Sequence, residues 1–133
     1  MIINGQAETK LILIVEDDEV MLKSLAAELT DGGFKVEKAE DGEVGLRLAL
    51  KEHPDLILLD IRLPKIDGVT VMEHLRKDSW GATAKVIVLS AVDPDHAMLE
   101  AVNRYTPAYY LVKSRVKLGE VTAKVKEVLE KTP

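Results

Sequence analysis

The sequence predicts an α/β fold in which helices cover both faces of a five-stranded parallel sheet. Short runs of β-branched residues and leucine alternate five times with segments whose apolar residues recur at helical spacing. Strand–helix–strand connections of this kind are right-handed and place helices on both faces of a parallel sheet. The 133 residues, 47% hydrophobic and 31% charged, suffice for one domain with a buried core.

Five segments are predicted to be strands. The continuous apolar runs at residues 11–15, 56–59 and 86–89 are typical of strands that are covered on both faces. Residues 34–37 alternate between apolar and polar side chains, which favours a half-exposed edge strand. Residues 108–112, with two tyrosines at their centre, are the fifth candidate.

The segments between the strands and after the last one predict five helices. The clearest apolar stripe lies at positions 22, 25, 26 and 29, and the Asp31-Gly32-Gly33 sequence is suited to end that helix. Residues 41–52 are also predicted to be helical, although Gly45 costs about 1 kcal/mol relative to alanine. The other three helices are predicted around residues 71–75, 98–105 and 118–129.

The domain is predicted to span residues 11–131, between a flexible polar leader at 1–10 and a short tail at 132–133. The leader lacks the basic-then-apolar order of a secretory signal. The apolar run at residues 11–15 is far shorter than the roughly 18 residues of a membrane-spanning helix. We therefore expect a cytoplasmic protein without a membrane partner.

The composition argues against several kinds of site. Eighteen Lys and Arg against 23 Asp and Glu give a net charge of −5, so a direct nucleic-acid partner is not expected. The chain has no cysteine, which excludes disulfides, zinc–thiolate sites and cysteine nucleophiles. No glycine-rich nucleotide-binding loop follows a predicted strand.

Polar side chains stand at the carboxyl ends of four predicted strands, where ligands of doubly wound sheets bind. Glu16 and Asp17 follow the first strand, and Asp60 ends the third. Ser90 ends the fourth strand and Lys113 ends the fifth. The three carboxylates repel one another unless a hard divalent cation such as Mg²⁺ binds between them. The sequence therefore predicts a metal site at this edge.

Asp60 carries the strongest chemical signal. It follows four apolar residues, where an ionised carboxylate without a partner would be costly. A carboxylate there can act as a nucleophile and form an aspartyl phosphate. Lys113 could then neutralise one phosphoryl oxygen, and the Ser90 hydroxyl could donate to another. Each residue alone also fits a structural role as a helix cap or a surface lysine, but all three at strand ends favour chemistry.

The segment at residues 60–68, DIRLPKIDG, resembles the phosphorylation loop of response-regulator receiver domains, the CheY-like superfamily of two-component signal transduction. Asp, then Leu or Met before Pro, then Asp-Gly recur at these spacings in that family. Residues 16–17, 88–91 and 110–113 resemble its acidic pair, its switch segment and its aromatic–lysine strand end. The resemblance covers about residues 10–131. It implies a flavodoxin-like doubly wound (βα)5 fold with strand order 2-1-3-4-5.

The resemblance implies a role for each residue of the site. Asp60 would accept a phosphoryl group from the phosphohistidine of a histidine kinase or a phosphotransfer protein, and Lys113 would pair with the phosphoryl oxygens. Mg²⁺ (or Mn²⁺) would bind Asp17, Asp60 and the backbone carbonyl of Arg62 directly. Glu16 would bind it through water.

The resemblance also implies an output mechanism. Ser90 would move towards the phosphoryl group, and Tyr110 would move inward into the space released. The face formed by the fourth helix, the fifth strand and the fifth helix would then bind a downstream protein effector or a second phosphorylated copy. Such a chain is not an enzyme with a separate substrate, although it assists its own phosphorylation and dephosphorylation.

One departure from the family concerns the residue after the lysine. The family usually has proline there, joined by a cis peptide bond, whereas Ser114 follows Lys113 in this chain. A cis bond before a residue other than proline costs roughly 2.5–4 kcal/mol. We therefore expect a trans bond.

Two alternative functions are open at this stage. A phosphatase with an aspartate nucleophile would need a second acid two residues later, and Arg62 occupies that position. A binding module that is never phosphorylated would not need Asp60, Ser90 and Lys113 together.

Overall fold

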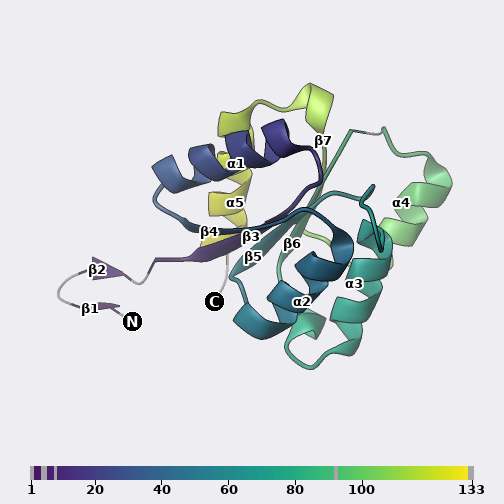
Figure 1. Ribbon diagram of the computed structural model, residues 1–133, viewed down its shortest axis with the longest axis horizontal. Helices are drawn as coiled ribbons and strands as arrows, with labels where there is room; N and C mark the ends of the chain where they lie inside the picture. The colour runs from purple at the N-terminus through teal and green to yellow at the C-terminus, as the bar shows by residue number, and fades with distance from the viewer. Residues whose placement is uncertain (1, 4–5, 8, 92, 132–133) are drawn as a thin grey trace.

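The chain folds as a parallel sheet between two layers of helices (Figure 1), and the computed structural model describes residues 2–3, 6–7, 9–91 and 93–131. The sheet strands run in the order β4-β3-β5-β6-β7. Counted along the chain over these five strands, this is the predicted order 2-1-3-4-5. The strands are β3 (Leu11–Val15), β4 (Lys35–Ala39), β5 (Leu56–Leu59), β6 (Val86–Ser90) and β7 (Tyr109–Val112).

Five α-helices cover the two faces of the sheet. As Figure 1 shows, α1 and α5 lie on one face, and α2, α3 and α4 lie on the other. Two single-turn 3₁₀ helices, η1 (Gly81–Thr83) and η2 (Lys113–Arg115), precede β6 and follow β7. The α-helices are α1 (Glu19–Asp31), α2 (Gly42–Glu52), α3 (Gly68–Lys77), α4 (His96–Asn103) and α5 (Leu118–Glu130).

The core lies on both faces of the central strands, as their continuous apolar sequences predicted. In β3, Ile12 and Ile14 pack with α1 and α5, whereas Leu13 and Val15 pack with α2 and α3. All four side chains are buried. Each such burial contributes roughly 1.5–3 kcal/mol. The sheet edge that follows these strands is thereby held rigidly.

Four helices begin at the carboxyl edge of the sheet with an aspartate N-cap. The carboxylate of each cap accepts a hydrogen bond from a backbone N–H two or three residues later, which contributes about 0.5–2 kcal/mol per helix. Asp18 accepts a second hydrogen bond from the backbone N–H of Met21. The four caps are Asp18 of α1, Asp41 of α2, Asp67 of α3 and Asp95 of α4.

Gly45, which the propensity argument counted as a cost, is required by packing. A Cβ atom at this position would lie 2.7 Å from Cγ1 of Val15, well inside van der Waals contact. The missing side chain lets α2 approach β3 directly behind the strand end that carries Glu16. The predicted helix at 41–52 is therefore present, with Asp41 as its cap.

The opposite, amino-terminal edge of the sheet carries an aromatic contact. His53 ends α2 and Trp80 follows α3, and their rings stack with centroids 4.4 Å apart and planes 11° apart. Both residues come shortly before a strand begins, so they lie a full strand length from Asp60.

Some boundaries differ from the predicted ones. The fourth predicted helix ends at Asn103, so Tyr105, the last residue of its predicted range, lies beyond it. In the leader, β1 (Ile2–Ile3) pairs with β2 (Gln6–Ala7) in a short antiparallel ladder that was not predicted. The flexibility of residues 1–10 stays a prediction, and the tail at 132–133 lies outside the described residues. Among the described helices, none has the length and apolar character needed to cross a membrane.

Candidate functional site

The register of the sheet places the strand-end acids side by side. Val15 of β3 pairs with Leu59 of β5, so Glu16 and Asp60 each follow a paired residue. The backbone N–H of Asp60 donates to the carbonyl of Val15 over 3.0 Å, which fixes the two strand ends together. These two acids, 44 positions apart in sequence, are neighbours because the strands are parallel and adjacent.

Three carboxylates gather at this edge, as predicted. One carboxylate oxygen from each of Glu16, Asp17 and Asp60 lies within 4.8 Å of the other two. Glu16 is 2% exposed and Asp60 6% exposed, whereas Asp17 faces solvent. An octahedral Mg²⁺ with bonds of about 2.0–2.1 Å spans at most about 4.2 Å between ligands. The spacing therefore suits a hard divalent cation that two of the carboxylates hold directly and the third holds through water.

Lys113 lies between the two buried acids. Its Nζ donates to Oδ2 of Asp60 over 3.1 Å and makes a shorter ion pair with Oε1 of Glu16. Burial acts to lower the pKa of Lys113, but the hydrogen bonds and charges of both carboxylates outweigh it, so the pKa is raised. Lys113 is therefore charged, and its ammonium group stands where a phosphoryl oxygen on Asp60 would need a cation.

Burial raises the pKa of Glu16 from 4.5 to about 7. The ammonium of Lys113 and the backbone N–H of Asp18, which donates to Oε2 over 3.1 Å, act in the opposite direction. The charge of Asp60 adds to the effect of burial. The Glu16 carboxyl therefore holds a proton for part of the time near neutral pH, and a bound cation would displace it.

The loop after β5 supports the Asp60 side chain. The backbone N–H of Arg62 donates to Oδ1 of Asp60 over 3.2 Å. Gly68 starts α3 directly against this backbone, since a Cβ atom there would lie 2.3 Å from the Asp60 carbonyl oxygen. The Asp-Gly at the end of the segment 60–68 thus has a packing reason, and the direct role of the Arg62 carbonyl as a metal ligand stays a prediction.

Ser90 and Tyr110 lie on β6 and β7 at different distances from the edge. Ser90 is buried and pairs with Val112, directly before Lys113. Tyr110 is half-buried, pairs with Val88 and packs with the α2–α4 side of the core. Its neighbour Tyr109 faces the other side, where its hydroxyl donates to Glu127 of α5. The alternation of the strand thus directs only Tyr110 towards α4.

The Lys113–Ser114 peptide bond is trans, as expected, like every other described peptide bond. Ser114 belongs to the single turn η2, which continues directly from β7. Lys113 nevertheless reaches both carboxylates, so its placement does not depend on the proline that the family usually has.

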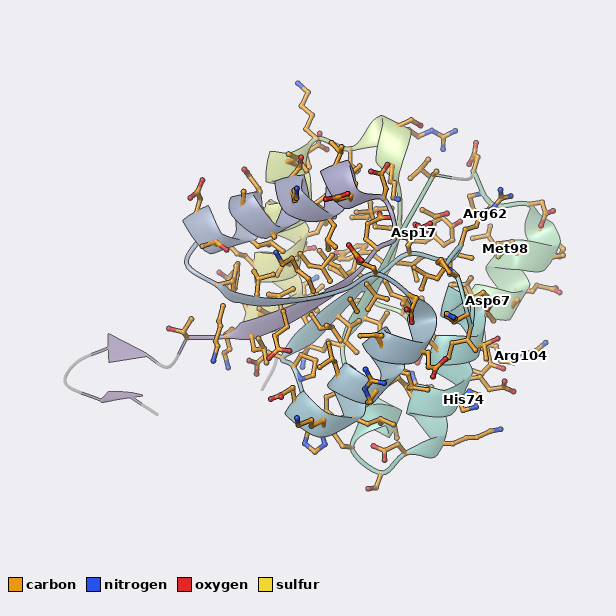
Figure 2. All side chains as sticks on the ribbon, viewed as in Figure 1. Asp17, Arg62, Asp67, His74, Met98 and Arg104 are labelled. Carbon is orange, nitrogen blue, oxygen red and sulfur yellow. The ribbon has the colours of Figure 1, made fainter. Side chains whose placement is uncertain are left out.

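Two features of the site were not predicted. A groove of about 530 Å³ runs from Asp17 along the loop after β5 to Met98 of α4. Figure 2 shows Asp17 and Arg62 at the carboxyl edge, with Met98 on the neighbouring helix. The second feature is an ion pair between Asp93 and Arg115 beside the site. Neither has a local sequence signal, because both depend on which loops the fold brings together. The groove is lined by Asp17, Ile61, Arg62, Leu63, Pro64, Asp67, Val69 and Met98.

The geometry of the site agrees with the similarity of this chain to known proteins. The family model described as response regulator receiver domain matches residues 12–126. The transcriptional regulatory protein PrrA of Mycobacterium tuberculosis is 42% identical over 123 residues, which cover 90% of this chain and 50% of PrrA. This chain thus spans about half the length of such curated relatives.

Solved structures show the same fold. A CheY-like response regulator receiver domain protein from Methanospirillum hungatei superimposes with a TM-score of 0.86 at 28% identity, covering 93% of this chain and 96% of that one. The Mn²⁺-bound form of the response regulator Rcp1 superimposes with a TM-score of 0.80 at 25% identity, covering 93% and 97%. The chain therefore belongs to the response regulator receiver domain family.

Proposed function

We propose that this chain is the phosphoacceptor switch of a two-component phosphorelay, with Asp60 as the acceptor. The observation that carries the proposal is the position of Asp60, held at the carboxyl edge between the Lys113 ammonium and the acidic pair. The phosphodonor is the phosphohistidine of a histidine kinase or a phosphotransfer protein. The proposal concerns this domain alone, since its relatives are about twice as long.

The transfer step requires little rearrangement at Asp60. A carboxylate oxygen of Asp60 attacks the phosphorus atom, the phosphorus–nitrogen bond of the phosphohistidine breaks, and the imidazole leaves with that electron pair and takes a proton. The acyl phosphate brings a charge of about −2 to a buried position. Lys113, already 3.1 Å from Oδ2, is positioned to neutralise one of the new oxygens.

We propose Mg²⁺, or Mn²⁺, as the cofactor. Asp17, Asp60 and the backbone carbonyl of Arg62 would hold it directly, with Glu16 acting through water. The spacing of the three carboxylates supports this set, as does the Mn²⁺ named for Rcp1, whose structure has the same fold. When bound, the cation neutralises charge on the carboxylates and the phosphoryl oxygens.

The output is proposed to run through Ser90 and Tyr110. Ser90 would donate its hydroxyl to a phosphoryl oxygen, and Tyr110 would shift on the side of the sheet that α4 covers. Because α4 buries only Val102 fully, a modest change beneath it can alter its position. The face of α4, β7 and α5 would then bind a protein effector or a second phosphorylated copy.

Three further expectations belong to the same proposal. The chain turns over no external phosphoester, because Arg62 stands where an aspartate-nucleophile phosphatase would need its second acid. It acts in the cytoplasm. The net charge of −5 supports the expectation that this domain itself contacts no nucleic acid, although PrrA, at twice the length, is named a transcriptional regulator.

The test is phosphorylation by a small-molecule phosphodonor, followed by intact-mass measurement. Wild type should gain one phosphoryl group in the presence of Mg²⁺, and the adduct should resist acid and be cleaved by base. Asp60→Asn should gain none. Asp67→Asn is the matched control, because Asp67 caps α3 in the same loop and asparagine also caps helices. Equal uptake by wild type and Asp60→Asn would show that Asp60 is not the acceptor.

A further inference from the structure

A bidentate ion pair between Asp93 and Arg115 joins the two loops that flank the phosphoacceptor. Nη1 of Arg115 donates to Oδ1 of Asp93 over 3.1 Å, and Nη2 donates to Oδ2 over a shorter distance. Both side chains are largely exposed, at 64% and 62%. The parallel geometry restrains the two side chains more than a single contact would.

The ion pair lies just beyond the carboxyl ends of the paired strands β6 and β7. Ser90 of β6 and Val112 of β7 are the last paired residues of these neighbouring strands. Asp93 and Arg115 each lie three residues beyond that last pair. Arg115 also belongs to the single turn η2 that begins at Lys113. The ion pair therefore ties the loop that follows Ser90 to the turn that carries Lys113.

The helix that follows Asp93 is only shallowly buried at this end, where its side chains are exposed or half-buried. Asp95 caps α4 two residues after Asp93, and Val102, near the far end of α4, is its only fully buried residue. The segment after that far end is anchored separately, since Nε of Arg76 donates to the carbonyl of Tyr105 over 2.8 Å. A movement of Ser90 towards Asp60 would draw on the loop that Asp93 ties to η2.

We propose that the Asp93–Arg115 pair is a latch that holds the loop after Ser90 in its unphosphorylated position. Releasing it shifts the domain towards the conformation that binds a phosphoryl group at Asp60. The proposal rests on the proposed function of Asp60 and adds a residue pair that sets the balance between the two conformations. Arg115 and Asp93 act through Ser90 and are positioning residues.

The size of the effect is bounded by the chemistry of an exposed pair. Exposed ion pairs shift equilibria only modestly, so breaking the latch should change the affinity of the activated state about two- to five-fold, or about 0.4–1 kcal/mol. The effect should shrink at high salt, because an exposed pair is screened. A larger change would need burial, and both side chains are more than half exposed.

The test measures the Kd of beryllofluoride, a phosphoryl mimic, in the presence of Mg²⁺ by calorimetry. The variants are Arg115→Gln, Asp93→Asn and the charge exchange Asp93→Arg with Arg115→Asp. Each single substitution should tighten binding about two- to five-fold, and the exchange should restore the wild-type Kd. Lys23→Gln, which breaks the exposed pair with Glu19 on α1, is the control and should leave the Kd unchanged.

The two single variants separate the latch from simple charge effects. Without a latch, removing the cation of Arg115 would weaken binding of an anion, and removing the anion of Asp93 would tighten it. The latch predicts tighter binding in both. Unchanged or weaker binding by either single variant, or an exchange that stays tighter than wild type, would overturn the latch. Failure of wild type itself to bind beryllofluoride would instead overturn the proposed function.

Discussion

Lys113 donates from its ammonium group to Oδ2 of Asp60 over 3.1 Å, across 53 positions of sequence. The same ammonium group pairs with Glu16, so one cation serves two buried carboxylates. Two acids and one base leave a net negative charge in a poorly hydrated place. Burial, aided by the charge of Asp60, keeps a proton on the Glu16 carboxyl near neutral pH. The net negative charge explains why a divalent cation fits here.

The first prediction concerns the pH dependence of stability without metal. Burial raises the pKa of Glu16 from 4.5 to about 7 in the folded chain. Between these values the unfolded chain has released the proton that the folded chain still holds. The free energy of unfolding should therefore fall as pH rises through this window, by at most about 1.4 kcal/mol per pH unit, and then level off.

Urea unfolding between pH 4.5 and 8, in the presence of a chelator, measures this pH dependence of the free energy of unfolding. Glu16→Gln should lack this part of the slope, because glutamine does not titrate. The exposed Glu43→Gln should keep it. The same slope in Glu16→Gln as in wild type would show that another group causes it.

The second prediction separates two adjacent aspartates by their roles. Asp17 belongs to the trio of carboxylates, whereas Asp18 caps α1 by accepting from Val20 and Met21. Asp17→Asn should weaken Mg²⁺ binding about tenfold or more, since it removes an anionic ligand. Asp18→Asn should change the affinity little, because asparagine caps a helix as well as aspartate does. Calorimetric titration with Mg²⁺ measures both, and equal losses would contradict the assignment.

The third prediction concerns a guanidinium group whose hydrogen bonds within the described part of the chain go to backbone carbonyls. Arg76 of α3 donates to the backbone carbonyls of Tyr105, Gly81 and Ala84, each over 2.8 Å, and burial lowers its pKa. Arg76→Met leaves these acceptors without that donor. It should lower the free energy of unfolding by about 2 kcal/mol or more.

Phosphorylation of Asp60 in Arg76→Met should persist at temperatures where the variant is folded, because Arg76 lies away from the carboxyl edge. Arg104→Met, at an exposed position just after α4, is the control and should change the free energy of unfolding little. Urea denaturation measures both variants. A loss below about 0.5 kcal/mol in Arg76→Met would mean that water replaces the guanidinium at no cost.

The fourth prediction uses the two adjacent tyrosines of β7, which face opposite sides of the sheet. Tyr110→Ala should keep the affinity for beryllofluoride within about twofold, but should lose the chemical-shift changes that beryllofluoride causes in α4. Tyr109→Phe removes only the hydroxyl that donates to Glu127. It should keep both the affinity for beryllofluoride and the chemical-shift changes in α4. Loss of affinity and of shift changes together in Tyr110→Ala would contradict a role limited to transmitting the signal.

The fold and the acidic centre could be predicted because their signals are local. A run such as residues 11–15 is apolar at every position, and the rule that parallel strands end at one edge then brings Glu16, Asp60 and Lys113 together. Gly45 shows the limit of propensity: its cost was counted, but the close approach of Val15 that requires it was not visible.

The features that could not be predicted from the sequence depend on packing between distant segments. Tyr105, a partner of Arg76, lies 29 positions away, and Asp93 meets Arg115 only because β6 and β7 pair in one register. No periodicity or motif marks either arginine. Tyr105 lies within the predicted range of the fourth helix but beyond its observed end, because helix boundaries depend on capping and tertiary contacts as well as on periodicity.

The stacking of Trp80 on His53 has an optical consequence. Trp80 is the only tryptophan of the chain and lies at the amino-terminal edge of the sheet, away from Asp60. A four-residue strand such as β5 separates these edges by roughly 13 Å. Intrinsic fluorescence should therefore report loss of the His53 contact on unfolding and stay silent when a metal ion or a phosphoryl mimic binds. Unfolding can thus be followed at any ligand concentration without correction of the emission signal.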